Sequence, residues 1–299
     1  MSKVLFPDPL LPAIIVIFFS VVFIFISLNF TFSYAANVTE YFSNLIPGEG
    51  ITEASININD GDEDQINFSI LGLRNIDKTD ISNFFTQFSL MNSEVNNKNR
   101  LIANIGFGNR ILTEDKSMML GANIFYDRDT FENHDRVGLG FEAKASMLDL
   151  NLNIYEALSN TVTVDNIDEK VLSGYELSIS SQMPFMPWAR FHYTDYEWEK
   201  DKAAVDTKGK IYSLEMSLSP TVIVEGSFDE SGNTGVDDES SLSVSYVYPP
   251  KEDAPTLADG LIASNAFEKR DMSKELSKKV RRTNKIVLET QGTIIVTSK

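Results

Sequence analysis

Two clusters of polar residues have types that could do chemistry. The first is the segment NDGDED, residues 59–64, whose carboxylates are the oxygen ligands that Ca²⁺ prefers. Its spacing differs from that of an EF-hand loop, so we interpret it as a solvated hairpin tip. The second is His134 beside Asp135, but no motif places a nucleophilic serine or a second histidine near this pair. The sequence therefore predicts no metal site, no cofactor and no enzyme.

A third cluster points to electrostatics rather than catalysis. Residues 265–285 contain eight Lys and Arg and three acidic residues, a net charge of +5 in a chain of 299 residues with a formal net charge of -17. Such asymmetry suggests that one part of the chain neutralises another. The overall acidity argues against nucleic acid as a partner. The absence of cysteine excludes disulfides and thiolate metal sites.

The elements that position these charges are predicted to be β-strands, because short stretches of alternating apolar and polar residues recur along the chain. In residues 148–155, for example, Leu148, Leu150, Leu152 and Ile154 alternate with polar residues and Tyr155. A soluble β-sandwich alternates too. However, the lack of cysteine, the aromatic residues near strand ends and a strict alternation of short turns with long polar loops favour a membrane barrel. Twelve strands are predicted, at residues 51–59, 65–73, 82–93, 100–112, 118–127, 136–145, 147–157, 174–183, 187–197, 209–219, 221–229 and 240–249. We therefore predict an all-β fold, a twelve-stranded antiparallel transmembrane β-barrel over residues 51–249.

The N-terminus has the features of an export signal. Lys3 precedes a long apolar run, and Ser33 and Ala35 are the small residues that a signal peptidase needs. We predict a signal peptide over residues 1–35, cleaved after Ala35; an uncleaved membrane anchor is the alternative. Residues 36–50 then form a short periplasmic segment. An even strand count places the N-terminus and both ends of the barrel in the periplasm, below the outer membrane of a Gram-negative-type bacterium.

Two marks in the sequence resemble one known family. The strands RLIANIGFGNRIL, MMLGANIFYDRDT and RVGLGFEAKA look like central strands of the inverse autotransporter β-domain, the intimin and invasin family. The segment MSKELSKKVRRTNKIVLE, residues 272–289, resembles the linker that follows this family's barrel. The resemblance covers about residues 51–290. It implies a barrel in outer-membrane lipid, inserted by the barrel assembly machinery, whose linker threads the pore and carries a passenger to the cell surface, usually an adhesin.

The chain departs from the family pattern after this linker. Only ten residues follow position 289, so we expect a β-domain without a passenger, and no surface ligand is assigned. Residues 250–299 are predicted to be a pore-threading linker, partly helical, and a short tail. The expected function is to export or anchor this C-terminal segment; a passive diffusion pore or a structural outer-membrane protein is the alternative. The candidate linker residues are Lys274, Lys278, Lys279, Arg281, Arg282 and Asn284.

Alternation also assigns side chains to the lumen. The predicted lumenal charges, mostly acidic, would attract a basic linker inside a narrow pore. They are Arg110, Asp127, Glu142, Asp149, Glu176, Glu215 and Glu225. Five glycines on three adjacent strands face the lumen by the same rule: Gly106, Gly108, Gly121, Gly138 and Gly140. Strand glycines mark a bend or a close approach. We hypothesise that they form a trough for a backbone lying against the wall, or that they relieve curvature where the sheet coils.

Overall fold

The structure is a computed structural model that describes residues 29–60, 65–252, 254–290 and 293–295. Residues 1–28, which hold most of the predicted signal peptide, lie outside the described residues. Positions 61–64 of the carboxylate cluster also lie outside them. Within the described part, no group of three or more potential metal-ligating side chains comes together.

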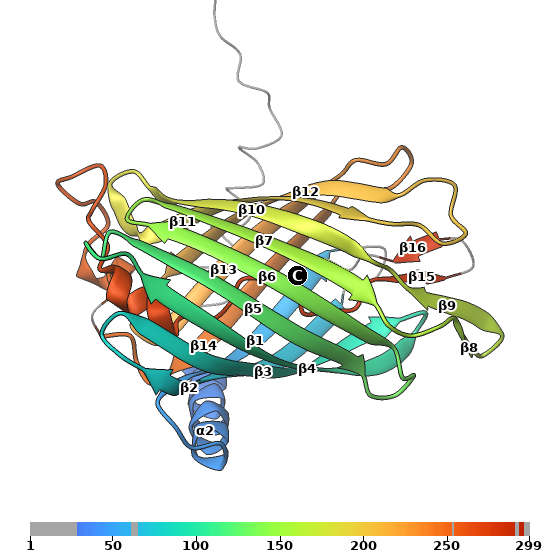
Figure 1. The fold of residues 1–299 in the computed structure, drawn as a ribbon, viewed down its shortest axis with the longest axis horizontal. Coiled ribbons are helices and arrows are strands. Elements are labelled where there is room, and N and C mark those ends of the chain that lie inside the picture. The colour runs from blue at the N-terminus through green and yellow to red at the C-terminus, as the bar shows by residue number, and fades with distance from the viewer. Residues whose placement is uncertain (1–28, 61–64, 253, 291–292, 296–299) are drawn as a thin grey trace, which may run out of the picture.

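Twelve antiparallel strands close into a barrel (Figure 1). Neighbours in the chain pair with one another, β7 pairs with β10, and β1 pairs with β14 to close the wall. Closure leaves the wall without a free edge. The barrel strands are β1 (Gly50–Asp60), β2 (Gln65–Lys78), β3 (Ser82–Val95), β4 (Lys98–Leu112), β5 (Met118–Asp129), β6 (Asp135–Ala145), β7 (Leu148–Ala157), β10 (Gly174–Met183), β11 (Met186–Trp198), β12 (Thr207–Ser217), β13 (Val222–Ser231) and β14 (Glu239–Tyr248). The predicted twelve-stranded barrel is confirmed.

The two faces of the wall follow the alternation of the sequence. Outward side chains at mid-strand are apolar and exposed, such as Ile105 (49 %) and Leu139 (47 %). Their inward neighbours are polar and buried, such as Asn104 (4 %). A large exposed apolar surface is unfavourable in water, whereas a lipid bilayer covers it without cost. Tyr126 and Phe228 lie exposed near strand ends on the same face, where an interfacial girdle is expected.

The connections give the barrel two different ends. At the short-turn rim, residues 79–81, 113–117, 146–147, 184–185 and 218–221 join the strands. The longest connections lie at the long-loop rim, and one of them forms a hairpin of β8 (Val162–Val164) and β9 (Ile167–Val171). The predicted strict alternation is wrong, because the connections 96–97 and 130–134 at the long-loop rim are no longer than the turn 113–117. Strands β3 and β4 meet in a two-residue turn. Asn96 and Asn97 have φ values of 52° and 59° there, which suit a tight hairpin.

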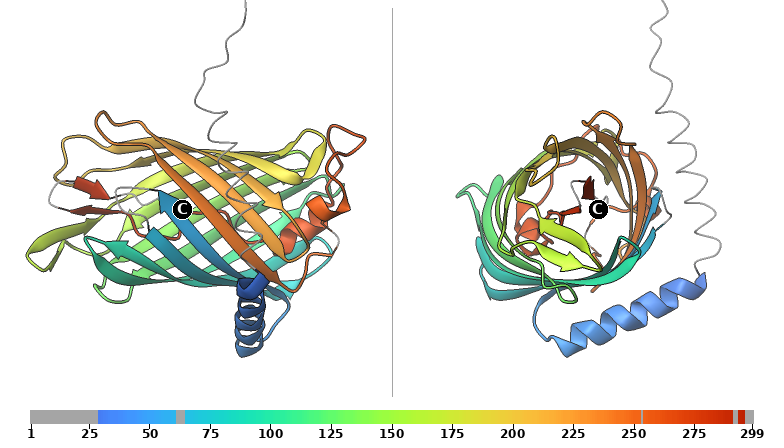
Figure 2. Two further views of the ribbon diagram at one scale, coloured as in Figure 1. Left: turned by 180° about the vertical axis from the view of Figure 1, so that it is seen from behind. Right: turned by 90° about the vertical axis from the view of Figure 1, so that its right-hand side faces the viewer.

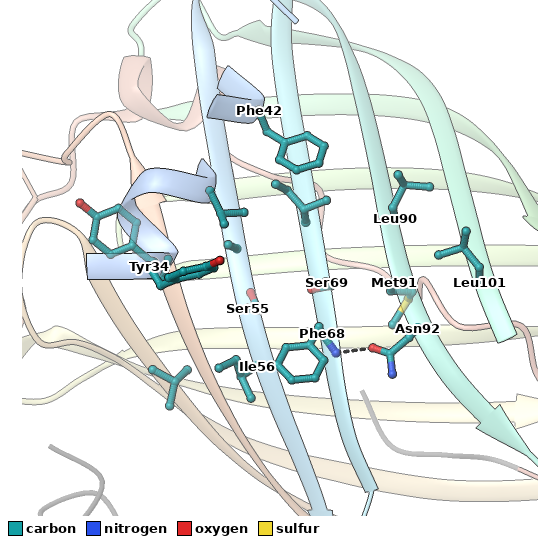
Figure 3. Close-up of a pocket in the computed structure, with 16 residues that line it drawn as sticks. Tyr34, Phe42, Ser55, Ile56, Phe68, Ser69, Leu90, Met91, Asn92 and Leu101 are labelled. Atoms are coloured by element: carbon teal, nitrogen blue, oxygen red, sulfur yellow. Dashed lines mark hydrogen bonds between the residues drawn. The ribbon is translucent and has the colours of Figure 1, made fainter. Parts of the chain in front are cut away.

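A helix, α2 (Asn29–Leu45), lies outside the barrel against β1 and β14 (Figure 2). Arg74 on β2 holds the chain just after the helix ends, because the guanidinium Nε donates to the carbonyl of Ile46 at 2.7 Å. An apolar groove of about 540 Å³ separates the helix from the wall; Phe42 lies on the helix side and Phe68 on the wall side (Figure 3). None of the described helices is both long and apolar enough to cross a membrane. The predicted cleavage site after Ala35 falls inside α2, and the predicted domain boundaries stay predictions.

The C-terminal segment returns through the interior of the barrel (Figure 2). After β14, the short helices η1 (Leu257–Asp259) and η2 (Met272–Ser277) lie at the short-turn rim. Asp271 caps η2 by accepting from the Ser273 N–H at 3.0 Å. At the long-loop rim, β15 (Leu288–Thr290) and β16 (Thr293–Ile295) extend the β8–β9 hairpin into a four-stranded sheet. We call residues 271–290 the linker. As predicted, it is partly helical, although its helix is a single 3₁₀ segment.

The outward face predicts a strong asymmetry in the effect of charge. Leu139→Arg places a cation in the lipid-facing belt near the middle of β6, and we expect it to cost about 2–4 kcal/mol of folding free energy. Ser69→Arg, on the inward face of β2, is the matched control and should cost much less. Folding into lipid vesicles under urea titration measures both. Equal losses at the two sites would contradict a membrane-spanning wall.

Candidate functional site

Apolar and polar contacts hold the linker at the short-turn rim, where it enters the lumen. Met272 and Leu276 of η2 pack against Leu112 and Met119 at the ends of β4 and β5. Asn83 on β3 donates from Nδ2 to the carbonyl of Leu276 at 2.8 Å. The last carbonyls of a helix have no partner within the helix, so the Asn83 amide stabilises the end of η2. The contacts fix where the helical part stops and the extended part begins.

Arg110 connects η2 to the barrel wall. Its Nη1 donates to the carbonyl of Leu276 at 3.2 Å, while Nε and Nη2 form a two-point pair with Glu142 at 2.8 and 3.1 Å. The guanidinium also stacks 4.5 Å from the centre of the Phe85 ring. Paired, hydrogen-bonded and stacked, this charge is compensated although it is fully buried. Arg110 and Glu142, both predicted to be lumenal, therefore act on the linker together.

Asp127 is the central anion of the site. Arg282 of the linker binds it at two points, with Nη1–Oδ1 2.8 Å and Nη2–Oδ2 2.6 Å. Arg136 donates from Nε at 2.9 Å, and Asn104 donates from Nδ2 at 2.8 Å. The side chains of Asp127 and Arg136 are fully buried, and that of Arg282 nearly so. Two-point Arg–carboxylate pairs are geometrically specific, so this contact sets the register of the linker in the barrel.

Glu176 on β10 holds the linker backbone one residue further on. Its carboxylate accepts from the Thr283 N–H at 2.9 Å and from the Thr283 hydroxyl at 2.6 Å. The Tyr155 hydroxyl and the Asn153 amide also donate to Glu176, both at 2.9 Å. Arg136 donates to the carbonyl of the same residue, Thr283, at 2.8 Å. Backbone groups at this point are thus satisfied by the wall, as buried groups require.

The remaining predicted charges lie toward the short-turn rim, where β12 ends just after Glu215 and β13 begins just before Glu225. Asp149 pairs with Arg190 and Arg270 near the short-turn rim, and Lys278 pairs with Glu275 within the linker. Glu225 and Glu215 face Arg281, at 2.5 and 3.9 Å. The Asn284 carbonyl accepts from Asn104 at 3.0 Å. Lys274 differs from the other predicted linker residues because it is exposed at the short-turn rim.

The five predicted glycines lie on the inward face, but aromatic rings occupy much of the space above them. A Cβ on Gly106 would come within 2.4 Å of the Phe125 ring, and one on Gly108 within 2.4 Å of the Phe85 ring. Gly140 lies under Asn123, and Gly121 under Arg110 and Glu142. Gly138 is the one near the linker, with Arg282 Nη2 3.1 Å from its would-be Cβ. Gly106 and Gly108 therefore make room for the rings that stack on Arg282 and Arg110, and Val280 of the linker packs against the same rings.

The linker leaves the lumen through a clasp of surface loops. The backbone of Leu288–Thr290 pairs with β9. Ile286 and Leu288 pack on Val95, Ile102 and Val171. The buried Glu289 carboxylate accepts from three successive backbone N–H groups of residues 201–203 at 2.7, 2.6 and 3.0 Å. Converging amides of this kind form an anion-binding nest.

Beneath this clasp, His134 takes part in a structural cluster. Its Nε2 lies 2.9 Å from Glu169 Oε2 on β9, and Arg100 donates to Glu169 Oε1 at 2.6 Å. Burial opposes the ionisation of Glu169, but the hydrogen bonds and the positive charge hold its pKa below its usual range. The histidine singled out in the sequence therefore helps to seat the hairpin that clasps the linker.

Several residues of the site do not stand out in the sequence by their type alone. Arg136 lies two residues before Gly138 and therefore on the same, inward face of the strand as Gly138, Gly140 and Glu142. The alternating pattern could have identified it as lumenal. Glu289 has no such signal, because its partners are backbone groups of a loop far away in the chain.

Removing Arg282 tests the central pair. Arg282→Met leaves the buried Asp127 with one cation fewer, and we expect linker docking to weaken by about 3–5 kcal/mol. Hydrogen exchange of the Val280 and Thr283 amides should accelerate at least about a hundredfold, since 1.4 kcal/mol corresponds to a factor of ten. Lys274→Met, at an exposed position, serves as the control. Similar exchange in the two variants would contradict the assigned role.

The clasp makes a separate prediction. Glu289→Gln keeps the shape of the side chain but removes the charge, and hydrogen bonds to charged groups contribute about 1.5–3 kcal/mol. We expect faster hydrogen exchange at the amides of residues 201–203, with residues 278–283 unchanged. Glu156→Gln, exposed at the same rim, is the matched control. Unchanged exchange at residues 201–203 would show that the nest does not hold the loop.

Comparisons with known proteins agree with this geometry. The family description "Inverse autotransporter, beta-domain" matches residues 32–284. Invasin of Yersinia enterocolitica is 30 % identical over 122 residues, 39 % of this chain and 14 % of invasin. The uncharacterized protein YchO of Escherichia coli (strain K12) is 28 % identical over 125 residues, 40 % of this chain and 26 % of YchO. The aligned regions thus span about a quarter or less of these relatives.

One solved structure shares the fold over a larger part of this chain than the two relatives do. It comes from work on the in-meso crystallization of membrane proteins; it covers 81 % of this chain and all of its own, with a TM-score of 0.65 and 20 % identity. At that identity the likeness concerns the fold alone. The family match extends from α2 through the barrel to Asn284 of the linker. The chain therefore belongs to the inverse autotransporter β-domain family, whose members are outer-membrane β-barrels.

Proposed function

We propose that this barrel carries its own C-terminal segment across the outer membrane and anchors it at the cell surface. The observation that carries the proposal is the path of the linker. It enters at the short-turn rim beside Arg110, passes Asp127 and ends paired with β9 at the long-loop rim. A segment held along its whole path by specific contacts is suited to a fixed, transmembrane position.

The orientation follows from the rims. In outer-membrane barrels the short turns face the periplasm and the long loops face the outside. By this rule the N-terminal segment is periplasmic, and residues 288–295 emerge outside. We further propose that the barrel assembly machinery inserts the chain, as the family implies, and that the outward apolar belt contacts outer-membrane lipid.

The chemistry of the lumen supports anchoring rather than catalysis. The family description is that of an autotransporter β-domain, and buried charges of the lumen pair with one another and with the linker, as Arg110 does with Glu142 and Asp127 with Arg282. A segment that continues from the linker would be displayed outside the cell. If that segment is an adhesin, its ligand is determined by the segment and not by the barrel. A passive diffusion pore that uses the full width of the lumen is the alternative, and it requires the linker to lie elsewhere.

The proposal is tested by labelling intact cells. An epitope tag added after Lys299 should bind antibody on whole cells, because the linker would deliver it to the outside. A tag in the loop 232–238 is the positive control, and a tag between Pro184 and Phe185 at the short-turn rim is the negative control. A C-terminal tag that is labelled only after permeabilisation would overturn the proposal.

A further inference from the structure

The linker does not lie in the centre of the lumen. Its backbone is bonded to one side of the wall, by Gln87 on β3, Asn104 on β4, Asn153 on β7 and Glu176 on β10. It reaches the other side, formed by β1, β13 and β14, through two long side chains. Lys279 contacts Glu53 at 2.6 Å and Arg281 contacts Glu225 at 2.5 Å.

A cavity of about 160 Å³ fills the space between the linker and that far side. At about 30 Å³ per molecule, it holds about five waters. Its wall is unusually rich in one residue type, since hydroxyl groups from four strands line it. They belong to Ser55, Ser69, Ser227, Ser241, Ser243 and Ser245.

Buried polar atoms without partners belong to residues that line the same space. Glu53, Asn67 and Arg281 line the cavity, and their Oε2, Nδ2 and Nε atoms have no hydrogen-bond partner among the described residues. Glu53 is 4 % exposed and Asn67 is 2 % exposed. An unsatisfied buried donor or acceptor costs about 1–3 kcal/mol, so these atoms require water or another polar molecule.

The cavity extends along the barrel as well as across neighbouring strands. Ser241 and Ser245 on β14 are four residues apart, about 13 Å along a strand. Ile223 lies at the short-turn end of β13, and Asn67 lies near the long-loop end of β2, yet both line the cavity. Its lining therefore spans much of the height of the wall.

We propose that this space is a hydrated passage that stays open beside the seated linker and admits water and small uncharged polar solutes of the size of glycerol. Serine hydroxyls both donate and accept, so they can replace the hydration of a small polyol. Among the charged residues that border the passage, Glu53 pairs with Lys279, Glu225 pairs with Arg281 and Arg282 pairs with Asp127. Lys285 is a fourth cation of the lining, so the border does not favour small cations. The pairs made by Lys279 and Arg281 cross the passage and exclude larger solutes.

The inference rests on the position of the linker but not on export of a segment. The barrel would combine an anchored polypeptide on the β3–β10 side with a solute path on the β1–β14 side. The labelling experiment above and the permeation experiment below can therefore fail independently.

The absence of cysteine from the native chain makes the test direct. In proteoliposomes that contain the full chain with Ser243→Cys, glycerol entry should exceed that of protein-free liposomes. Water-soluble methanethiosulfonate reagents should modify this cysteine. Modification with a bulky reagent should reduce glycerol entry several-fold, because the attached group would fill the passage. Leu242→Cys, one position away on the outward face, is the matched control, and its modification should leave glycerol entry unchanged.

Three results would overturn the proposal. Glycerol entry no faster than in protein-free liposomes would exclude a passage. A cysteine at position 243 that resists the reagent would exclude a hydrated space. Modification of that cysteine without any loss of glycerol entry would place the solute path elsewhere. Because serine and cysteine are similar in size, the variant preserves the wall, and heat-modifiable gel mobility verifies that it is folded.

Discussion

The structure of the filled barrel depends on the pairing of Asp127 with Arg282 and Arg136, whose charged groups are buried inside the lumen. A lone carboxylate buried in this way would be very costly, and a lone guanidinium would be too. Neither the wall nor the linker solves the problem alone, because the wall supplies the anion and one cation and the linker supplies the second cation. The interaction therefore couples the closed wall to the seated linker, and it fixes the register of every contact above and below it.

The same logic explains the aromatic rings and glycines around this pair. Phe125 lies 4.2 Å under the Arg282 guanidinium, and Phe85 lies 4.5 Å under that of Arg110. Each ring turns inward over a glycine on the neighbouring strand, where a side chain would block it. Small residues in the wall thus allow flat rings to lie against it, and flat rings provide a surface on which a guanidinium is stabilised. Packing and electrostatics support one another here.

Two kinds of contact surround the linker, and they suit two physical roles. On the side of β3–β10, the wall satisfies the backbone groups of the linker, so that this side holds it tightly. On the side of β1, β13 and β14, long cationic side chains bridge a serine-lined space, so that this side stays hydrated. A threading segment that filled the lumen evenly would need every wall residue to match it. Binding on one side lets a barrel of fixed circumference hold a single extended chain.

Local patterns in the sequence were enough to predict the wall of the barrel. Alternation with a period of two assigns each side chain to lipid or lumen, and this local rule gave the twelve strands and placed residues such as Asp127 and Glu225 on the inward face. It could also indicate the basic linker, because charge asymmetry is visible without structure. Which charges meet could be seen only in the folded chain, since Arg282 of the linker and Asp127 are 155 positions apart in the sequence. The tertiary structure alone placed Glu289 in its nest of backbone amides, turned Phe125 over Gly106 and left one side of the lumen open. These features depend on how distant segments approach in space, and no local pattern of residue types records that.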